Sequence, residues 1–104
     1  MYRFKLLTLA LVIHAGVAAA QGADPHLGRS LAASCSNCHG TNGVSQGAVP
    51  SLAGAAKADL VAKMQEFKSG KRPGTIMPQL AKGYSDDQIE AIAAWFAAQK
   101  PSGS

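Results

Sequence analysis

Apolar residues form one nearly continuous run at the start of the chain, over residues 6–17. Two basic residues precede this run, and three alanines ending at Ala20 follow it. A basic start, an apolar stretch of about 12 residues and a small-residue cleavage site are the three parts of a secretory signal peptide. A membrane anchor would need about 20 apolar residues. We therefore expect residues 1–20 to be a cleaved signal peptide and residues 21–104 to form a single domain, exported to the periplasm.

Beyond this run, apolar residues recur with helical spacing in three stretches. The first covers about 25–36, where Asp24 and Pro25 suit the N-cap and the first position of a helix. The second covers about 57–69, with apolar residues at i, i+4 and i+7. A glycine at the end, Gly70, is typical of a helix C-terminus. These two patterns predict two amphipathic helices.

The third stretch has the clearest beginning. Ser85 and Gln88 have the spacing of a capping box, and two acidic residues lie in the first turn. Four apolar residues then form a stripe along one face: Ile89, Ile92, Ala93 and Phe96. The pattern predicts a helix that begins at Ser85 and ends before Pro101.

The segments between these stretches favour loops. Residues 40–50 and 71–83 are rich in glycine, proline and turn-forming residues, so we expect loops there, with at most a turn inside the second. Residues 51–54 are expected to form one helical turn. No stretch alternates with period two for long enough to be a strand, and none in 21–104 is apolar enough to be a transmembrane anchor. The prediction is an all-α domain of three main helices and long loops, and loops of this length are usually functional or held by a ligand.

Composition and charge narrow the classes of function. Only 6% of the residues are aromatic, although 47% are hydrophobic, which indicates that something other than side chains fills part of the core. Loss of the signal peptide would lower the formal net charge from +4 to +2. There is no dense basic stripe interleaved with aromatic residues, so no nucleic acid partner is expected. One basic cluster, over residues 68–72, favours a solvated helix end, with a docking patch as the alternative.

The candidate chemistry lies in the sequence Cys35-Ser-Asn-Cys38-His39. C-x-x-C-H is the attachment signature of c-type haem. Two thiols with this spacing can each reach one vinyl group of the same macrocycle, and the next residue then lies under the iron as an axial ligand. We therefore expect one covalent haem c, held by Cys35 and Cys38 through thioether bonds and by His39 through the iron.

Three other uses of this motif remain open from the residues alone. A disulfide between Cys35 and Cys38 could form in an oxidising compartment. A thioredoxin-like site would need a preceding strand, which the pattern does not predict. A zinc site would need a fourth ligand, and His26 is the only other histidine in residues 21–104.

Met64, Met77 and His26 are the candidates for the second axial ligand. Met64 belongs to the apolar face of the second predicted helix, which favours a role in core packing. His26 is too close along the chain to reach the opposite haem face easily. Met77 precedes Pro78 in a predicted loop, so we expect Met77 to bind the iron. A thioether ligand raises the reduction potential, as an electron carrier requires, and two filled axial positions disfavour enzymatic oxygen or peroxide chemistry.

These motifs resemble those of class I c-type cytochromes over residues 25–99. The shared features are a first helix, C-x-x-C-H-G, a glycine-rich loop with Pro50, a later Met-Pro and a terminal helix with Trp95. The resemblance implies the class I cytochrome c fold around a single haem. It also implies that the ring of the axial histidine donates to the carbonyl of Pro50, and that Gly28 and Trp95 pack where the first and last helices meet.

A closer resemblance lies in Phe-Lys-Ser-Gly-Lys-Arg at 67–72, Thr-Ile-Met at 75–77 and Gly-Tyr-Ser-Asp at 83–86. These resemble the cytochrome subunit of flavocytochrome c sulfide dehydrogenase, which implies an FAD-containing sulfide-oxidising subunit as electron donor and a further, downstream electron acceptor. The chain has one C-x-x-C-H, unlike the two-haem form of that subunit. The alternative is a free periplasmic cytochrome that carries electrons to a terminal oxidase or another acceptor.

The segments expected around the haem edge carry no charge. They offer five apolar residues: Val44, Ala48, Val49, Ile76 and Leu80. Such a rim suits a stable docked complex better than a fast shuttle steered by charge, which salt would weaken.

Overall fold

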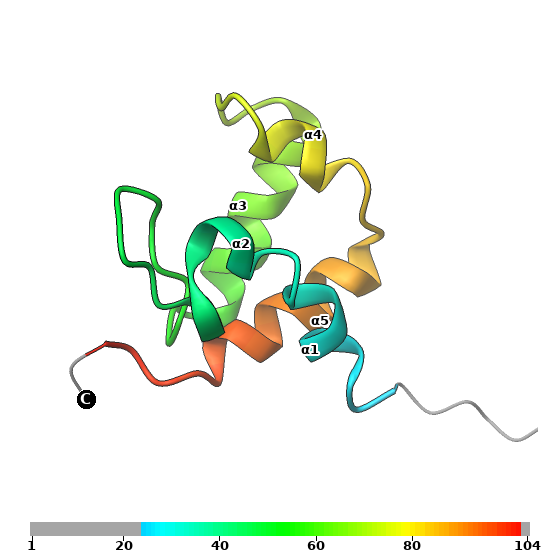
Figure 1. Ribbon diagram of the computed structural model, residues 1–104. Coiled ribbons are helices and arrows are strands. Elements are labelled where there is room, and N and C mark those ends of the chain that lie inside the picture. Colours follow the sequence, from blue (N-terminus) through cyan, green and yellow to red (C-terminus); the bar gives the residue numbers. More distant parts are fainter. Residues whose placement is uncertain (1–23, 103–104) are drawn as a thin grey trace, which may run out of the picture.

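The computed structural model describes residues 24–102, and the predicted signal peptide lies outside this range. The described residues form five α-helices and one 3-10 turn, without a strand (Figure 1): α1 (Leu27–Ala32), α2 (Ser36–His39), η1 (Thr41–Gly43), α3 (Lys57–Ser69), α4 (Met77–Ala81) and α5 (Asp86–Ala97). The all-α class predicted from the sequence is therefore confirmed.

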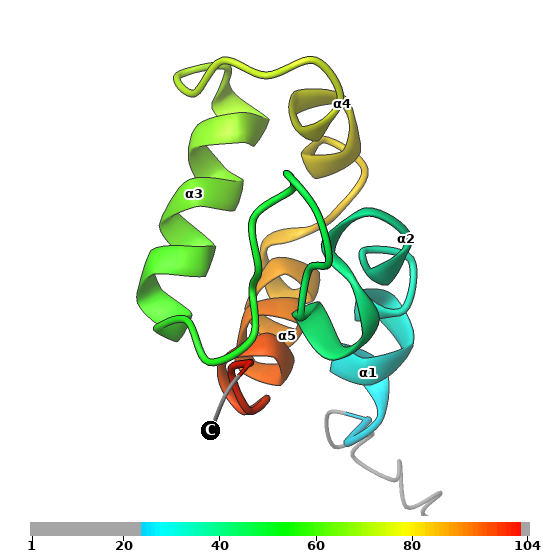
Figure 2. The same ribbon diagram turned by 60° about the vertical axis from the view of Figure 1, so that its left-hand side comes forward.

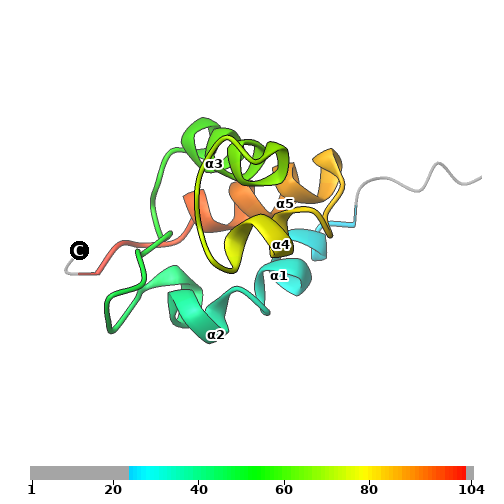
Figure 3. The ribbon, with the colours of Figure 1, turned by 90° about the horizontal axis from the view of Figure 1, so that it is seen from above.

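Helix α5 organises the hydrophobic core. Its predicted stripe is buried throughout, from Ile89 to Phe96. The predicted capping box is present: the Ser85 side chain accepts from the Gln88 backbone N–H, and the Gln88 side chain accepts from the Ser85 N–H. The helix packs against α1 on one side and α3 on the other (Figures 2 and 3). Ala32 and Leu60 join the core from these two helices.

Helices α1 and α5 cross at a point where only glycine fits. A Cβ added to Gly28 would lie 2.5 Å from the Ala91 carbonyl oxygen and 3.1 Å from the Trp95 Cβ. Trp95 in turn meets the Phe96 ring edge-on, with centroids 5.0 Å apart. The resemblance to class I cytochromes implied this pairing of Gly28 with Trp95, and the structure contains it.

The first predicted helix is shorter than expected and divided in two. α1 ends at Ala32, and a separate turn of helix, α2, begins at Ser36. Between them the Ser34 hydroxyl donates to the Leu31 carbonyl at 3.1 Å, and the Cys35 N–H to that of Ala32 at 3.0 Å. Such local side-chain bonds and tight backbone turns compete with the regular helical ladder. The haem-attachment motif therefore occupies a helical turn of its own.

The prediction for residues 71–83 is also corrected. Instead of a loop with at most a turn, this segment contains α4, and Met77 is its first residue. Pro78 lies in the first turn, where a missing N–H and a fixed φ favour a helix start. The backbone N–H groups of Gln79 and Leu80 donate to the Ile76 carbonyl. The proline interpreted as a loop residue thus initiates a short helix.

Residues 44–51 form a loop beside α2, coloured green in Figure 1. The Gly43 carbonyl closes its base by accepting from the N–H groups of Leu52 and Ala53, at 2.8 and 3.1 Å. A third bond, from Ser45 N–H to the Ser51 hydroxyl at 2.9 Å, closes the loop further along. The helical turn expected at 51–54 is absent, and a simple turn lies at residues 53–54. These bonds fix the position of Pro50.

Candidate haem site

The motif cysteines lie on α2 and at its start. Cys35 is the N-cap of α2, and Cys38 is three residues further on, so both project from one side of the turn. Both are free thiols; Cys35 is half-buried against the core cluster and Cys38 is exposed. Burial raises the pKa of the Cys35 thiol above its ordinary value, a hydrogen bond from Ser34 offsets part of the rise, and Cys38 adds to it. The two thiols thus face different surroundings within one helical turn.

Gly40 turns the chain away directly after His39. It has φ +87°, and a Cβ at this position would overlap the Val44 carbonyl. Only glycine adopts this conformation without strain. The glycine after C-x-x-C-H therefore sends the chain back past α2 into the loop that carries Pro50.

The His39 side chain is oriented by a single hydrogen bond. Its Nδ1 lies 2.6 Å from the carbonyl oxygen of Pro50, eleven residues along the chain. Because a carbonyl can only accept, Nδ1 carries the proton, and Nε2 keeps its lone pair free for a metal. A backbone carbonyl behind a ligating histidine holds both the ring orientation and the tautomer. The contact that the resemblance implied for Pro50 is present.

The candidates for the second axial ligand lie in different surroundings. Met77 is half-buried at the start of α4. Met64 is also half-buried and is not part of the core cluster, so the core-packing role expected for it is not confirmed. Leu60 is the one residue of α3 that is buried, because the later turns of that helix extend past α5 toward α4 (Figure 2). His26 is exposed, just before α1.

Several apolar side chains around these segments are exposed. The large hydrophobic residues exposed within 24–102 are Val49, Ile76 and Leu80, at 38%, 56% and 47%. All three belong to the rim predicted from the sequence. The buried core lies instead along α5, and α4 packs chiefly against α3 rather than against α2. Free thiols, a metal-competent histidine and uncovered apolar side chains in neighbouring segments fit a flat apolar cofactor with a central iron.

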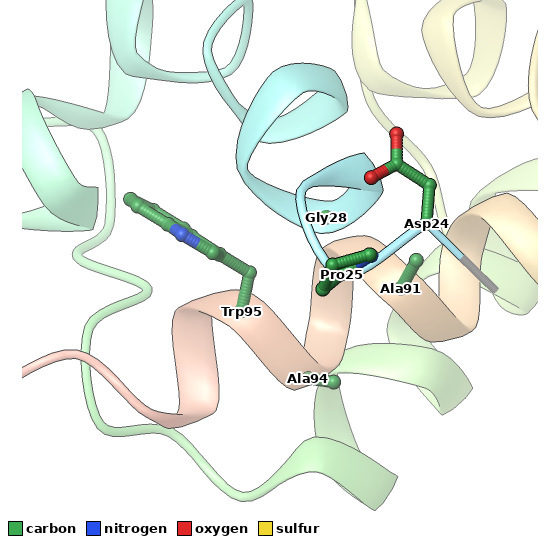
Figure 4. A pocket seen from close by; sticks show the side chains of 6 residues that line it. All are labelled: Asp24, Pro25, Gly28, Ala91, Ala94 and Trp95. Carbon is green, nitrogen blue, oxygen red and sulfur yellow. The ribbon is translucent and has the colours of Figure 1, made fainter. Parts of the chain in front are cut away.

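A separate open pocket lies where α1 crosses α5 (Figure 4). Its lining is Asp24, Pro25, Gly28, Ala91, Ala94 and Trp95. None of these residues belongs to C-x-x-C-H, the Pro50 loop or α4. The pocket follows from the small residues at the crossing and contributes no candidate ligand.

The alternatives for the motif find little support in the described part of the chain. Zinc needs four convergent ligands, and no three His, Cys, Asp or Glu side chains within residues 24–102 are grouped to hold a metal ion. A thioredoxin-like site needs a strand before the motif, and none occurs in this range. Over the same residues, no helix has the length and hydropathy needed to cross a bilayer.

Comparison with known proteins identifies the class. Residues 26–100 match the family model for cytochrome c. The chain therefore belongs to the cytochrome c family: it is a c-type cytochrome with covalently bound haem c, and it carries electrons.

Three relatives show which members of the family it is similar to. It is 39% identical over 69 residues to the cytochrome subunit of sulfide dehydrogenase of Chlorobaculum tepidum, covering 66% of this chain and 63% of that protein. It is 42% identical over 98 residues to cytochrome c4 of Pseudomonas aeruginosa, covering 93% of this chain and 47% of that one. It is 38% identical over 74 residues to the thiosulfate dehydrogenase electron acceptor of Thiomonas intermedia, covering 69% and 34%. The chain thus spans less than two thirds of each of these relatives.

Proposed function

We propose that Cys35 and Cys38 hold the haem by thioether bonds, and that His39 and Met77 are the axial ligands of its iron. The observation that carries this proposal is the bond from His39 Nδ1–H to the Pro50 carbonyl, which leaves Nε2 available. Haem c supplies an iron that takes up and releases one electron. A thioether ligand favours the ferrous state and raises the reduction potential. With both axial positions filled, the protein transfers electrons rather than activating a substrate at the iron.

The chain's own residues have three tasks in this function. The α2 turn presents both thiols and the imidazole within five residues. The Pro50 carbonyl restrains the rotation of the imidazole by accepting a hydrogen bond from its Nδ1–H. Val49, Ile76 and Leu80 keep water away from the cofactor edge and leave an uncharged surface there. Rigid ligands and low water access both limit the reorganisation that accompanies a change of charge on the iron.

The proposed electron donor is an FAD-containing, sulfide-oxidising flavoprotein in the periplasm, to which this cytochrome is bound as a haem subunit. Similarity to the cytochrome subunit of sulfide dehydrogenase supports this assignment. The basic and apolar run before residue 21 supports export. The uncharged rim favours a docked complex held by apolar contact, because it offers no charge for steering a transient partner. A further protein then accepts the electrons from the haem.

Similarity to cytochrome c4 and to a thiosulfate dehydrogenase electron acceptor favours a second candidate. In that case the chain is a free periplasmic cytochrome that carries electrons to a terminal oxidase or another acceptor. Both candidates share the haem site and differ in whether the donor stays bound.

Gel filtration of the native periplasmic fraction at about 0.3 M salt distinguishes them, since surface electrostatics are then screened within less than about 8 Å. For the subunit, haem and flavin absorbance co-elute, and sulfide reduces the haem in that fraction. Leu80→Asp, which places a charge in the rim, should release the cytochrome, whereas Ala62→Asp on the exposed side of α3 should not. A cytochrome that elutes alone, and that no flavin fraction reduces with sulfide, identifies the free carrier.

A further inference from the structure

Tyr84 connects three parts of the molecule just before α5 begins. We propose that it is a positioning residue, which holds the Met77-bearing segment 71–84 at a set distance from the haem-attachment motif. This inference rests on the proposed function, because it takes Met77 as the axial ligand. It is argued from the contacts of Tyr84 with Ser34 and Lys68, which lie outside both the C-x-x-C-H motif and the buried core.

The first contact joins the Tyr84 hydroxyl to the Ser34 hydroxyl, at 3.2 Å across 50 residues. Ser34 directly precedes Cys35. Either hydroxyl can donate in this bond, and the Ser34 hydroxyl also lies 3.1 Å from the Leu31 carbonyl oxygen. Of the hydrogen bonds within residues 24–102, this one alone links segment 71–84 to the segment that carries Cys35, Cys38 and His39.

The second contact fixes the Tyr84 backbone from the other side. The Lys68 ammonium, near the end of α3, donates to the Tyr84 carbonyl at 2.7 Å and lies 3.4 Å from an Asp86 carboxylate oxygen. Gln65 donates to the same carboxylate oxygen at 2.8 Å. Tyr84 is therefore held between α3 and the turn before α2, and its ring packs on the core cluster between them.

The segment also begins on the last turns of α3. The Arg72 guanidinium pairs with the Glu66 carboxylate at 2.7 Å, and the Arg72 N–H donates to the Glu66 carbonyl at 3.1 Å. The same guanidinium lies 5.7 Å from the centre of the Phe67 ring. Segment 71–84, yellow in Figure 1, is thus attached at both ends to α3, and α4 itself packs on α3.

Attachment to α3 alone would let the segment move together with the end of that helix. The bond to Ser34 removes this freedom, since it ties the far end of the segment to the residue next to Cys35. Segments with few buried contacts open locally at low free energy, and a single extra bond changes that equilibrium measurably. Tyr84 thereby couples the side of the site that carries His39 to the side that carries Met77.

The test uses the intact haem protein and four variants: Tyr84→Phe, Ser34→Ala, the double variant, and Ser69→Ala as control. Tyr84→Phe keeps the ring and removes the hydroxyl that bonds to Ser34. Ser69 makes the same local bond as Ser34, from its hydroxyl to the Glu66 carbonyl three residues earlier at 3.2 Å, so Ser69→Ala reports the loss of that bond alone. Two quantities are measured in denaturant: loss of the far-red methionine–iron band, and loss of helical circular dichroism.

Tyr84→Phe and Ser34→Ala should each raise the ratio of methionine-dissociated to ligated protein by about two- to twelvefold, the range that corresponds to one hydrogen bond. The double variant should add nothing to either single change, and Ser69→Ala should leave the ratio unchanged. The proposal would be overturned if the methionine–iron band and the helical circular dichroism changed together in the variants. It would also be overturned if the effects of the two substitutions were additive.

Amide hydrogen exchange on the same proteins separates this inference from the ligand assignment. The N–H groups of Leu80, Gly83 and Tyr84, bonded within the segment, should exchange about two- to twelvefold faster in Tyr84→Phe, while Ile89 in α5 should not change. If Met77→Ala keeps the far-red band, Met77 is not the ligand. Hydrogen exchange alone then decides whether the Tyr84–Ser34 bond holds segment 71–84. If amide exchange becomes equally faster at Ile89, or faster nowhere, the proposed role of the Tyr84–Ser34 bond is wrong, whichever residue is the ligand.

Discussion

The segments that carry His39 and Met77 differ in how far apart in the sequence their stabilising contacts lie. Around His39 the contacts join residues that are close along the chain: the helical turn begins after Cys35, Gly40 reverses the chain, and the Pro50 carbonyl is eleven residues away. The Met77 segment depends on contacts at longer range. Its start is fixed locally, because Arg72 pairs with Glu66 six residues earlier, whereas its end is fixed by Lys68 across 16 residues and by Ser34 across 50 residues.

The position of His39 thus depends mainly on contacts between residues near it in the sequence, whereas the position of Met77 also depends on tertiary contacts. The hydrogen bonds of the His39 side lie within residues 35–53, although Cys35 also packs on the core cluster. The Met77 side requires α3, α5 and the turn before α2 to be assembled first. We therefore expect the Met77 side to open at lower free energy than the His39 side.

Removal of the attachment cysteines should have the largest effect. Cys35→Ser combined with Cys38→Ser abolishes both thioether bonds, so the denatured protein should show the mass of the polypeptide alone, without one haem. Asn37→Ala, between the cysteines and exposed, should keep the full haem mass. Covalent haem in the double serine variant would show that Cys35 and Cys38 are not the attachment residues.

Replacement of Met77 breaks the other side selectively. Met77→Ala should remove the far-red band and lower the reduction potential while covalent haem is retained, because loss of the thioether favours the ferric state. Met64→Leu nearly conserves volume and should keep the band, at a stability cost below about 1.5 kcal/mol. Spectroscopy and potentiometry check both, and a reversed pattern would identify Met64 as the ligand.

A substitution at the helix crossing should weaken both sides together. In Gly28→Ala the new methyl would meet the Ala91 carbonyl at 2.5 Å, so α1 and α5 must separate. Overpacking of this kind costs about 1–3 kcal/mol, measured by thermal or denaturant unfolding.

Gly47→Ala is the matched control, since nothing lies within 4 Å of a Cβ there. It should be nearly neutral or slightly stabilising. If Gly28→Ala leaves stability unchanged, the two helices do not need this close approach.

The smallest effect concerns acid stability of the Met77 side. Hydrogen bonds from Gln65 and Lys68, together with the Lys68 charge, hold the pKa of the Asp86 carboxyl below its ordinary value of 3.8. Its contribution is therefore present above pH 3.8 and is lost as the pH falls through the lower pKa of the folded state. Asp86→Asn should flatten the acid end of the stability curve slightly. Asp87→Asn removes the same charge one residue later, and an identical curve for both variants would contradict the assignment.

The structure also shows where sequence patterns were reliable. The stripe of α5 and its capping box are as predicted, because adjacent residues supply both the cap and the buried face. The pattern missed α4, since Pro78 was interpreted as a breaker rather than as a helix-starting residue. It also extended the first helix through Ser34, whose hydroxyl instead bonds to Leu31 and ends α1.

The sequence by itself predicted the cofactor and the helices α1, α3 and α5, because a haem-attachment motif and amphipathic stripes are short-range patterns. The resemblance already implied that the Pro50 carbonyl lies behind His39, whereas only the tertiary structure decided that Met64 and Met77 are both half-buried. It also decided that Tyr84 connects Ser34 to Lys68. The physical reason is distance along the chain. Contacts within one turn follow from backbone preferences, whereas contacts across 16 or 50 residues exist only once α3 and α5 have packed.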